Sequence, residues 1–220
     1  MKIYFLHFLF ILPILISCSD KPTSSVDIIN RSIFFHDVNN NWKTFDQQLK
    51  FESRFSFNDS IPEELHLSFK TAHNYFRYMN IDRNINLEYL ADSCISNTSV
   101  EYCSNYSWTS KFYPYFWGLP MKLQDPETKI QPNFKPTIFN GFKTWEIQVN
   151  YEAENFWFFF DQVDYQLRGF KFLKNDSSEK GEIIILRDLM KVDGILLPKH
   201  RTWLHKDSSL IGTNELLEVE

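Results

Sequence analysis

Five aromatic residues stand side by side at residues 156–160, in the stretch NFWFFFDQ, and an aspartate ends the run. Successive side chains of a β-strand point to opposite faces of the sheet, so this run places aromatic rings on both faces. A strand with one face in water would instead alternate apolar and polar residues. The run therefore predicts a strand that is covered on both faces.

Other segments show the alternation that this run lacks. Phe45, Leu49 and Phe51 share one parity, whereas charged or amide side chains take the other. Such alternation is typical of strands with one buried face. Together these patterns predict strands near residues 44–57, 64–70, 75–79, 87–91, 145–151, 155–161, 165–173, 181–189, 195–204 and 210–220.

Two segments favour helices. Residues 25–38 place Val26, Ile29 and Ile33 on one helical face, as an amphipathic helix requires. Residues 107–117 carry many aromatics with no strand period, and we expect a helix there that is kinked or restarted near Pro114. An irregular, proline-bearing link should follow, to about Pro136.

The order of these elements predicts the fold class. Short loops between successive strands favour antiparallel neighbours and a meander. Aromatics on both faces of the strand at 156–160 would leave a large exposed apolar patch on an open sheet, which soluble domains avoid. We expect the two helices to cover that second face. The prediction is a mainly β domain spanning residues 25–220, a half-barrel formed by a single curved antiparallel sheet of about 9–11 strands, with one or two helices on its concave face.

The first residues predict export and lipid anchoring. Residues 1–17 resemble a lipoprotein signal peptide, because the apolar run is shorter than a membrane-spanning helix and ends in Leu-Ile-Ser-Cys, a lipobox. Cys18 would then be acylated, with palmitate among the chains that it carries, and residues 18–24 would form a polar tether. The alternative is an ordinary secretory signal followed by an incidental cysteine. Lipid anchoring predicts the bacterial cell envelope, at the outer membrane, with the membrane as partner.

Two further cysteines, Cys94 and Cys103, remain in the exported part of the chain. An even pair in an oxidising compartment predicts a disulfide, across a hairpin with its tip at residues 97–100. Two unpaired thiols are the alternative.

Several function classes find no support. The net charge is −5 and no cluster of Lys or Arg gives a basic stripe, which argues against nucleic acid as a partner. The six glycines are too far apart for a phosphate-binding loop. His200 and His205 would point to opposite faces of a strand, and Asp161 and Asp164 fit a turn better than an acid–base pair. We therefore expect no catalytic residue, no metal, no cofactor and no enzymatic activity.

The C-terminal half resembles a family of Bacteroidota lipoproteins of uncharacterised function. The resemblance rests on YFWGLPMKLQDPETKI, NFWFFFDQVDYQLRGFKF, GEIIIL and GILLPKHRTWL with LIGTNEL, and covers residues 113–217. It departs from the family pattern at Glu127, where the family has glycine, and at the cysteine pair. The family is similar in layout to the LolA/LppX-like lipoprotein-carrier fold, a half-barrel closed by helices over an apolar cavity. This resemblance implies a protein that handles lipids or lipoproteins.

The leading hypothesis is a lipid-anchored protein that binds an acyl chain or lipid in the concave face of its sheet, without catalysis. The alternative is an interaction module whose groove is filled by its own aromatics and which docks a partner protein. One parity of the central strand should line any cavity, beside the helix at 107–117. The lining candidates are Trp108, Phe112, Trp117, Phe156, Trp157, Phe158 and Phe160.

Overall fold

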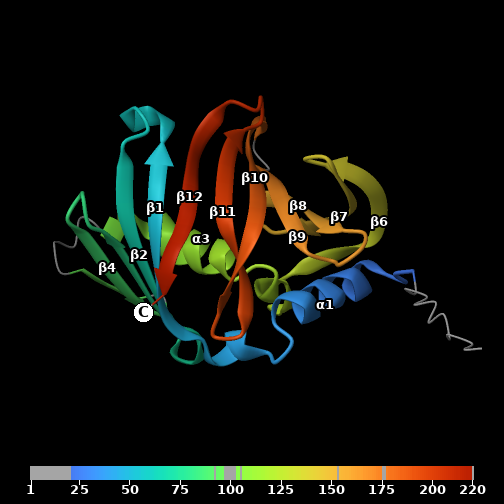
Figure 1. The fold of residues 1–220 in the computed structure, drawn as a ribbon, viewed down its shortest axis with the longest axis horizontal. Coiled ribbons are helices and arrows are strands. Elements are labelled where there is room, and N and C mark those ends of the chain that lie inside the picture. Colours follow the sequence, from blue (N-terminus) through green and yellow to red (C-terminus); the bar gives the residue numbers. More distant parts are fainter. Residues whose placement is uncertain are drawn as a thin grey trace, which may run out of the picture.

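The computed structural model describes residues 21–219, apart from residues 92, 97–102, 105, 153 and 175–176. The described residues form one antiparallel sheet of twelve strands that curves around two helices without closing into a barrel (Figure 1). The strands are β1 (Asp46–Phe55), β2 (Pro62–Lys70), β3 (Tyr75–Asn80), β4 (Ile85–Leu90), β5 (Ser93–Ser96), β6 (Lys129–Phe139), β7 (Phe142–Asn150), β8 (Glu154–Asp161), β9 (Leu167–Lys174), β10 (Ser177–Val192), β11 (Ile195–His205) and β12 (Leu210–Val219).

Two meanders make up the sheet. Its strand order is β5-β4-β3-β2-β1-β12-β11-β10-β9-β8-β7-β6, so only the β1–β12 pair joins strands that are distant in sequence. Phe51 of β1 lies opposite Leu216 of β12, and both are fully buried. The predicted single curved antiparallel sheet is confirmed, with twelve strands where about nine to eleven were expected.

The prediction of an irregular link up to Pro136 is wrong, because β6 begins at Lys129 and occupies the last part of it. Pro132 and Pro136 lie within this strand and cannot donate backbone hydrogen bonds. β6 is the last strand of the sheet order, so one side of it has no neighbouring strand. Edge strands tolerate proline for this reason. The register of β6 with β7 also shifts between Ile130 and Phe134, on either side of Pro132.

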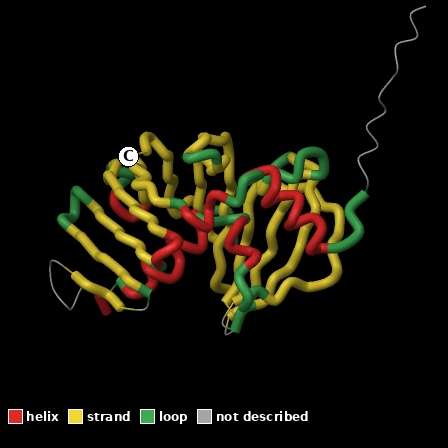
Figure 2. Tube along the Cα trace, turned by 90° about the horizontal axis from the view of Figure 1, so that it is seen from below, coloured by secondary structure: helices red, strands yellow, loops and turns green. Residues whose placement is uncertain are grey.

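Both predicted helices are present, and they lie on the inner side of the curved sheet (Figure 2). Helix α1 (Ser25–His36) has Ser24 as its N-cap, and the Ser24 hydroxyl oxygen accepts a 3.1 Å hydrogen bond from the Asp27 amide. Helix α3 (Ser107–Trp117) continues through Pro114 rather than restarting there. Short 3₁₀ turns connect the elements: η1 (Asn41–Thr44), η2 (Ser56–Asn58), η3 (Thr71–His73) and η4 (Met121–Gln124).

The helices cover one face of strand β8, which is third from the β6 edge of the sheet and not central as expected. Phe158 and Phe160 are fully buried and Phe156 is nearly so. The Phe156 ring lies 6.3 Å, centroid to centroid, from the ring of Phe116 in α3 and 5.8 Å from the ring of Tyr115. This parity of β8 therefore belongs to the core between sheet and helix.

The other face of β8 is covered without a helix, which corrects the expectation that the helices cover the second face. The Phe159 ring stacks on Phe139 from the end of β6, with centroids 4.1 Å apart and ring planes 7° apart. Gly169 in β9 leaves room for this stack, since a Cβ there would lie 2.5 Å from the Phe139 ring. The Lys171 ammonium lies 5.0 Å from the centroid of Trp157. On the outer face, the end of β6 thus covers Phe159, and Lys171 of β9 lies over Trp157.

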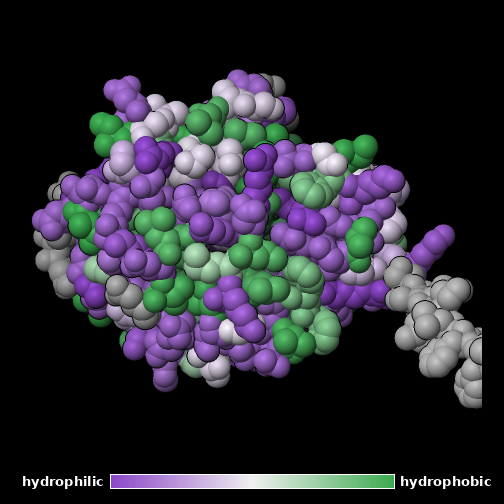
Figure 3. Space-filling view, viewed as in Figure 1, coloured by the Kyte–Doolittle hydropathy of each residue, from purple (hydrophilic) through white to green (hydrophobic). Residues whose placement is uncertain are grey.

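Elsewhere the outer surface is mixed. Figure 3, in the orientation of Figure 1, shows mostly hydrophilic residues with apolar ones gathered in patches across the lower middle. Within the described residues, no helix is long and apolar enough to span a bilayer.

Candidate ligand-binding cleft

A cleft of about 900 Å³ opens between α3 and the two arms of the sheet. One wall comes from η1 and strands β2, β3 and β4, and the other from the β7–β8 connection and η4. The residues of α3 that lie between the walls include Phe112, Pro114 and Tyr115. The apolar and aromatic lining consists of Trp42, Phe69, Tyr75, Phe76, Tyr89, Ala91, Phe112, Pro114, Tyr115, Tyr151 and Phe156.

The spacing of aromatics along α3 decides which part of the concave face stays open. Phe116 stacks on Phe170 with centroids 5.1 Å apart, and Trp117 meets Phe51 edge-on at 5.5 Å. These two α3 side chains are buried and fill the middle of the concave face. Phe112, one turn earlier, is only partly buried and borders the cleft instead.

The predicted lining residues therefore separate into three groups. Phe112 and Phe156 line the cleft. Trp117, Phe158 and Phe160 are packed in the core, each at most 2% exposed.

The two other candidates lie away from the cleft. Trp108 is 45% exposed at the start of α3, where its ring stands 5.6 Å from that of Tyr113. Trp157 points to the outer face of the sheet, beside Lys171. The structure thus brings together only two of the seven predicted lining residues.

Hydroxyl groups form a short hydrogen-bonded chain within the cleft. The phenol oxygens of Tyr115 and Tyr151 are 2.9 Å apart, and Thr128 Oγ1 lies 3.3 Å from the Tyr151 hydroxyl. Burial is the main cause that raises the pKa of Tyr115 well above its usual value, and the neighbouring Tyr151 adds to this effect. Burial also raises the pKa of Tyr151. Both phenols therefore stay neutral at physiological pH. Their mutual hydrogen bond uses the proton of one phenol, so the other phenol can donate to a polar group.

Charged side chains surround the apolar lining. Lys43, Lys111 and Lys122 contribute cations, and Lys122 pairs with Asp125. The Lys111 ammonium lies 5.7 Å from the centroid of the Phe112 ring. Carboxylates come from Asp125, Glu127, Glu152 and Glu154. An apolar lining with hydroxyls and a charged rim suits a ligand with an apolar body and a polar end.

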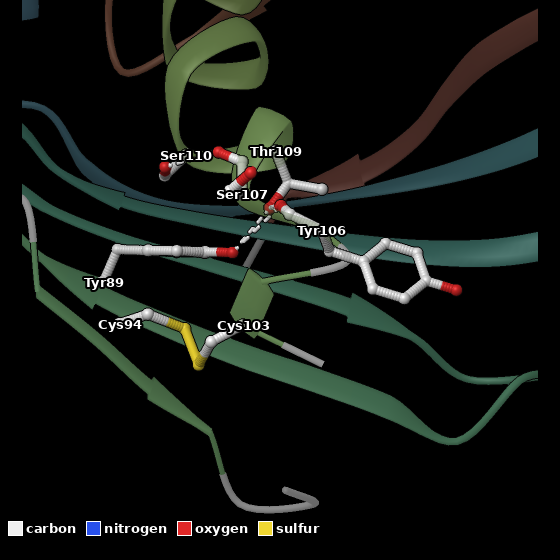
Figure 4. Close-up of a disulfide and its surroundings, with 7 residues drawn as sticks. All are labelled: Tyr89, Cys94, Cys103, Tyr106, Ser107, Thr109 and Ser110. Atoms are coloured by element: carbon white, nitrogen blue, oxygen red, sulfur yellow. Dashed lines mark hydrogen bonds between the residues drawn. A yellow bond between two sulfur atoms is a disulfide. The ribbon is translucent and has the colours of Figure 1, made fainter. Parts of the chain in front are cut away.

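Two contacts fasten the start of α3 to the sheet (Figure 4). Cys94 of β5 forms a disulfide with Cys103, with their Cα atoms 5.9 Å apart. Tyr89 of β4 reaches Thr109 of α3, and the two hydroxyl oxygens are 2.9 Å apart. The hairpin tip predicted at residues 97–100 lies outside the described residues, and so does Cys18. The N-terminal end of α3 is thereby held at the edge of the cleft.

The carboxylates that resemble an acid–base pair do form a turn. Asp161 Oδ1 accepts a 2.9 Å hydrogen bond from the Val163 amide, and Asp164 Oδ1 accepts one of the same length from the Gln166 amide. The Arg168 guanidinium bridges both carboxylates, at 2.8 and 3.5 Å. Across the described part of the chain, no group of three or more His, Cys, Asp or Glu side chains is arranged to hold a metal ion.

Comparison with known proteins supports the fold. No protein-family model and no curated protein matches the sequence, so the resemblance to Bacteroidota lipoproteins stays a prediction. A LolA superfamily protein from Nitrosomonas europaea superposes with a TM-score of 0.58 at 5% identity, covering 90% of this chain and 93% of that protein. A domain named for sorting outer membrane lipoproteins, from Vibrio parahaemolyticus, gives 0.55 at 8% identity, covering 89% and 91%. The chain therefore shares its fold with these two proteins.

Most of the cleft lining was absent from the sequence-based set. Phe69 and Phe76 lie on the inward parity of strands that the alternation predicts, and Tyr115 follows Phe112 by three positions on the same helix. These periodicities place the residues on the correct faces. They give no sign that Trp42 and Tyr151, which are more than 100 residues apart in the sequence, line one cleft.

Proposed function

We propose that this protein is a lipid-anchored cell-envelope protein of bacteria that binds an acyl chain or lipid without catalysis. The cleft between α3 and the sheet is the binding site in this proposal, and Cys18 carries the anchor. The ligand's apolar chain lies against Phe112 and Phe156, and its polar end meets the Tyr115 and Tyr151 hydroxyls.

The observation that carries the proposal is the cleft itself. Its volume of about 900 Å³ lies within the range of small-molecule sites, and eleven of its lining residues are apolar or aromatic. Its location on the concave face of a LolA-type fold is a further support. The carrier function named for the Vibrio parahaemolyticus domain belongs to that protein, and comes to this chain only as part of the proposal.

A second function, docking of a partner protein, is favoured by the packing of α3. Phe116 and Trp117 fill the centre of the concave face, so an acyl chain has no path through it while α3 stays in place. In this alternative the cleft accepts side chains of a protein partner instead of a lipid.

Titration of the purified protein with a fluorescent fatty acid separates the two functions. The lipid-binding proposal predicts saturable binding that Phe112→Asp weakens by roughly tenfold or more, because a carboxylate is then placed against the apolar chain. Ile138→Asp serves as the matched control, since Ile138 is 73% exposed and does not line the cleft. The control variant should bind like the wild type. A folded wild-type protein that binds neither this probe nor a phospholipid would instead support the docking function.

A further inference from the structure

Helix α1 carries exposed apolar side chains in addition to those that it buries against the sheet. Ile28, Ile29 and Ile33 are buried against the sheet. Val26, at the border of the buried face, is 49% exposed, and Phe34, on the opposite face, is 66% exposed. A surface helix of a globular protein normally carries polar residues there. Val38, just beyond the helix, extends the apolar stripe with 55% exposure.

The turn between β8 and β9 enlarges this surface. A groove of about 620 Å³ runs between α1 and the turn, lined by Asn30, Arg31, Phe34, Phe35, Val38, Asp164 and Tyr165. Val163, next to the groove residue Asp164, is 85% exposed. We call the exposed side chains of Val26, Phe34, Val38 and Val163 the outer α1 surface. Isolated exposed apolar residues are ordinary, but a group beside a groove indicates an interaction surface.

Charged residues beside the outer α1 surface connect α1 to the turn between β8 and β9 and pair with one another. Arg31 donates a 3.2 Å hydrogen bond to the Tyr165 hydroxyl, and its guanidinium carbon lies 5.2 Å from the Tyr165 ring centroid. The carboxylates are paired as well, Asp27 with Arg31 at 2.9 Å and Asp164 with Arg168 at 3.5 Å. Both nearby acids thus have a cationic partner, which limits repulsion from an anionic surface.

The position of α1 in the chain identifies what covers this surface. Seven residues, 18–24, separate the proposed anchor from the first residue of α1. A fully extended chain of that length spans at most about 25 Å. The first turn of α1 therefore cannot move further than that from the bilayer in which the anchor is inserted. Tethering also raises the effective concentration of the bilayer at α1, so weak apolar contacts suffice for docking.

We propose that the outer α1 surface docks on the bilayer that holds the lipid anchor. Phe34 and Val38 insert at the level of the headgroups, as apolar faces of interfacial helices do. Docking then fixes the orientation of the whole sheet relative to the membrane. This inference rests on the Cys18 anchor of the proposed function and is independent of what the cleft binds.

A single introduced thiol tests the docking in the full-length, acylated protein. Cys94 and Cys103 are joined in a disulfide, so Phe34→Cys supplies a free thiol for a fluorescent label. Phe57→Cys is the matched control, because Phe57 is 70% exposed and lies in η2, which follows the end of β1 away from α1 (Figure 1). The labelled proteins are reconstituted into phosphatidylcholine vesicles and exposed to aqueous iodide or to brominated lipid.

If the surface docks, iodide should quench the label at residue 34 no more than about one third as strongly as the label at residue 57. Brominated lipid should quench only the former. Equal iodide quenching at both positions, in protein that is acylated by mass and floats with the vesicles, would overturn the docking. Shielding from iodide without quenching by brominated lipid would also overturn it and point to a second copy. Protein that lacks the acyl mass would contradict the anchor instead. If Phe34→Cys lowers the melting temperature, Val38→Cys takes its place.

Discussion

The guanidinium carbon of Arg201 lies 4.5 Å from the centroid of the Trp117 ring, beneath α3 in the middle of the concave face. Phe51 lies on another side of the same group, with its centroid 5.7 Å away. Arg201 is only 2% exposed, and it donates a 3.0 Å hydrogen bond from Nη1 to the carbonyl oxygen of Pro198. Within the described residues, no carboxylate pairs with Arg201 and its Nε–H has no hydrogen-bond acceptor. Burial lowers the pKa of Arg201 to about 9, so the group remains charged at neutral pH.

We predict that Arg201→Met leaves the protein as stable as the wild type or makes it more stable. In the wild type, only ring contacts and one hydrogen bond offset the cost of desolvating this charge. The variant removes the charge and keeps a long apolar side chain. Replacing buried ionic groups with apolar residues of similar volume stabilises some proteins by about 1–4 kcal/mol. Urea unfolding at pH 7 measures the change.

Trp117→Ala is the companion variant. It should lower the free energy of unfolding by about 3–5 kcal/mol, because it opens a cavity and removes the ring above the cation. A loss of more than about 2 kcal/mol in Arg201→Met would contradict the prediction and show that the cation–π contacts more than repay the burial of the charge.

His36 provides a pH-dependent link between α1 and the sheet. Its Nε2 accepts a 3.2 Å hydrogen bond from the Leu167 amide, so the ring proton is on Nδ1, which donates to the Leu196 carbonyl oxygen at 2.6 Å. The buried ring is therefore neutral. Burial lowers the pKa of His36 from 6.5 to about 4, an effect that outweighs the opposing influence of Leu196 and Asp164.

The lowered pKa predicts a loss of stability in acid. Below pH 6.5 the unfolded chain binds a proton at this residue that the folded chain does not bind, until the folded pKa of about 4 is reached. Stability from this group is thus fully present above pH 6.5 and falls by about 3 kcal/mol as the pH drops to 4. Urea unfolding of wild type and His36→Leu at pH 7 and pH 4 tests this. The wild-type advantage should shrink by that amount, and an advantage that stays constant would refute it.

The disulfide should contribute to stability and to the placement of α3. The two cysteines are nine residues apart in sequence, and closing a loop of that size stabilises by about 2.5–3 kcal/mol in the chain-entropy model. We expect the double variant Cys94→Ser/Cys103→Ser to lose roughly this free energy of unfolding. Hydrogen exchange should also become faster near Thr109. The bond itself is checked by the intact mass after alkylation without reductant, where two alkylated thiols would contradict it.

The sheet could be predicted because its signals are local. Alternation in β1 and β2 directly reports one buried face, and residues such as Leu65 and Leu67 are buried as it indicates. Strand β6 was not predicted, because Pro132 and Pro136 suggested irregular chain. An edge strand tolerates these prolines. The stacking of Phe139 on Phe159 was not predicted for another reason. It depends on a contact between Phe139 and Gly169, thirty residues apart, that no local period records.

The cleft was harder to predict than the sheet. Phe112 and Phe116 are one helical turn apart and chemically identical, yet the first borders open space and the second is packed in the core. The difference arises from how α3 is seated on Phe51 and Phe170, which is a property of three-dimensional packing. A sequence can name the aromatics of a concave face but cannot divide them between filling and lining.

The lipid anchor gives the last prediction. If Cys18 is acylated, cells grown with a clickable fatty acid should yield labelled protein in the membrane fraction. Cys18→Ser should lose the label and leave the membranes, because the acyl chains on Cys18 are the membrane anchor in the proposed function. The variant Cys94→Ser/Cys103→Ser is the matched control and should keep the label, since it alters cysteines without touching the lipobox. Label that persists on Cys18→Ser would show that acylation occurs elsewhere. Absence of label from the wild type would favour an ordinary secretory signal.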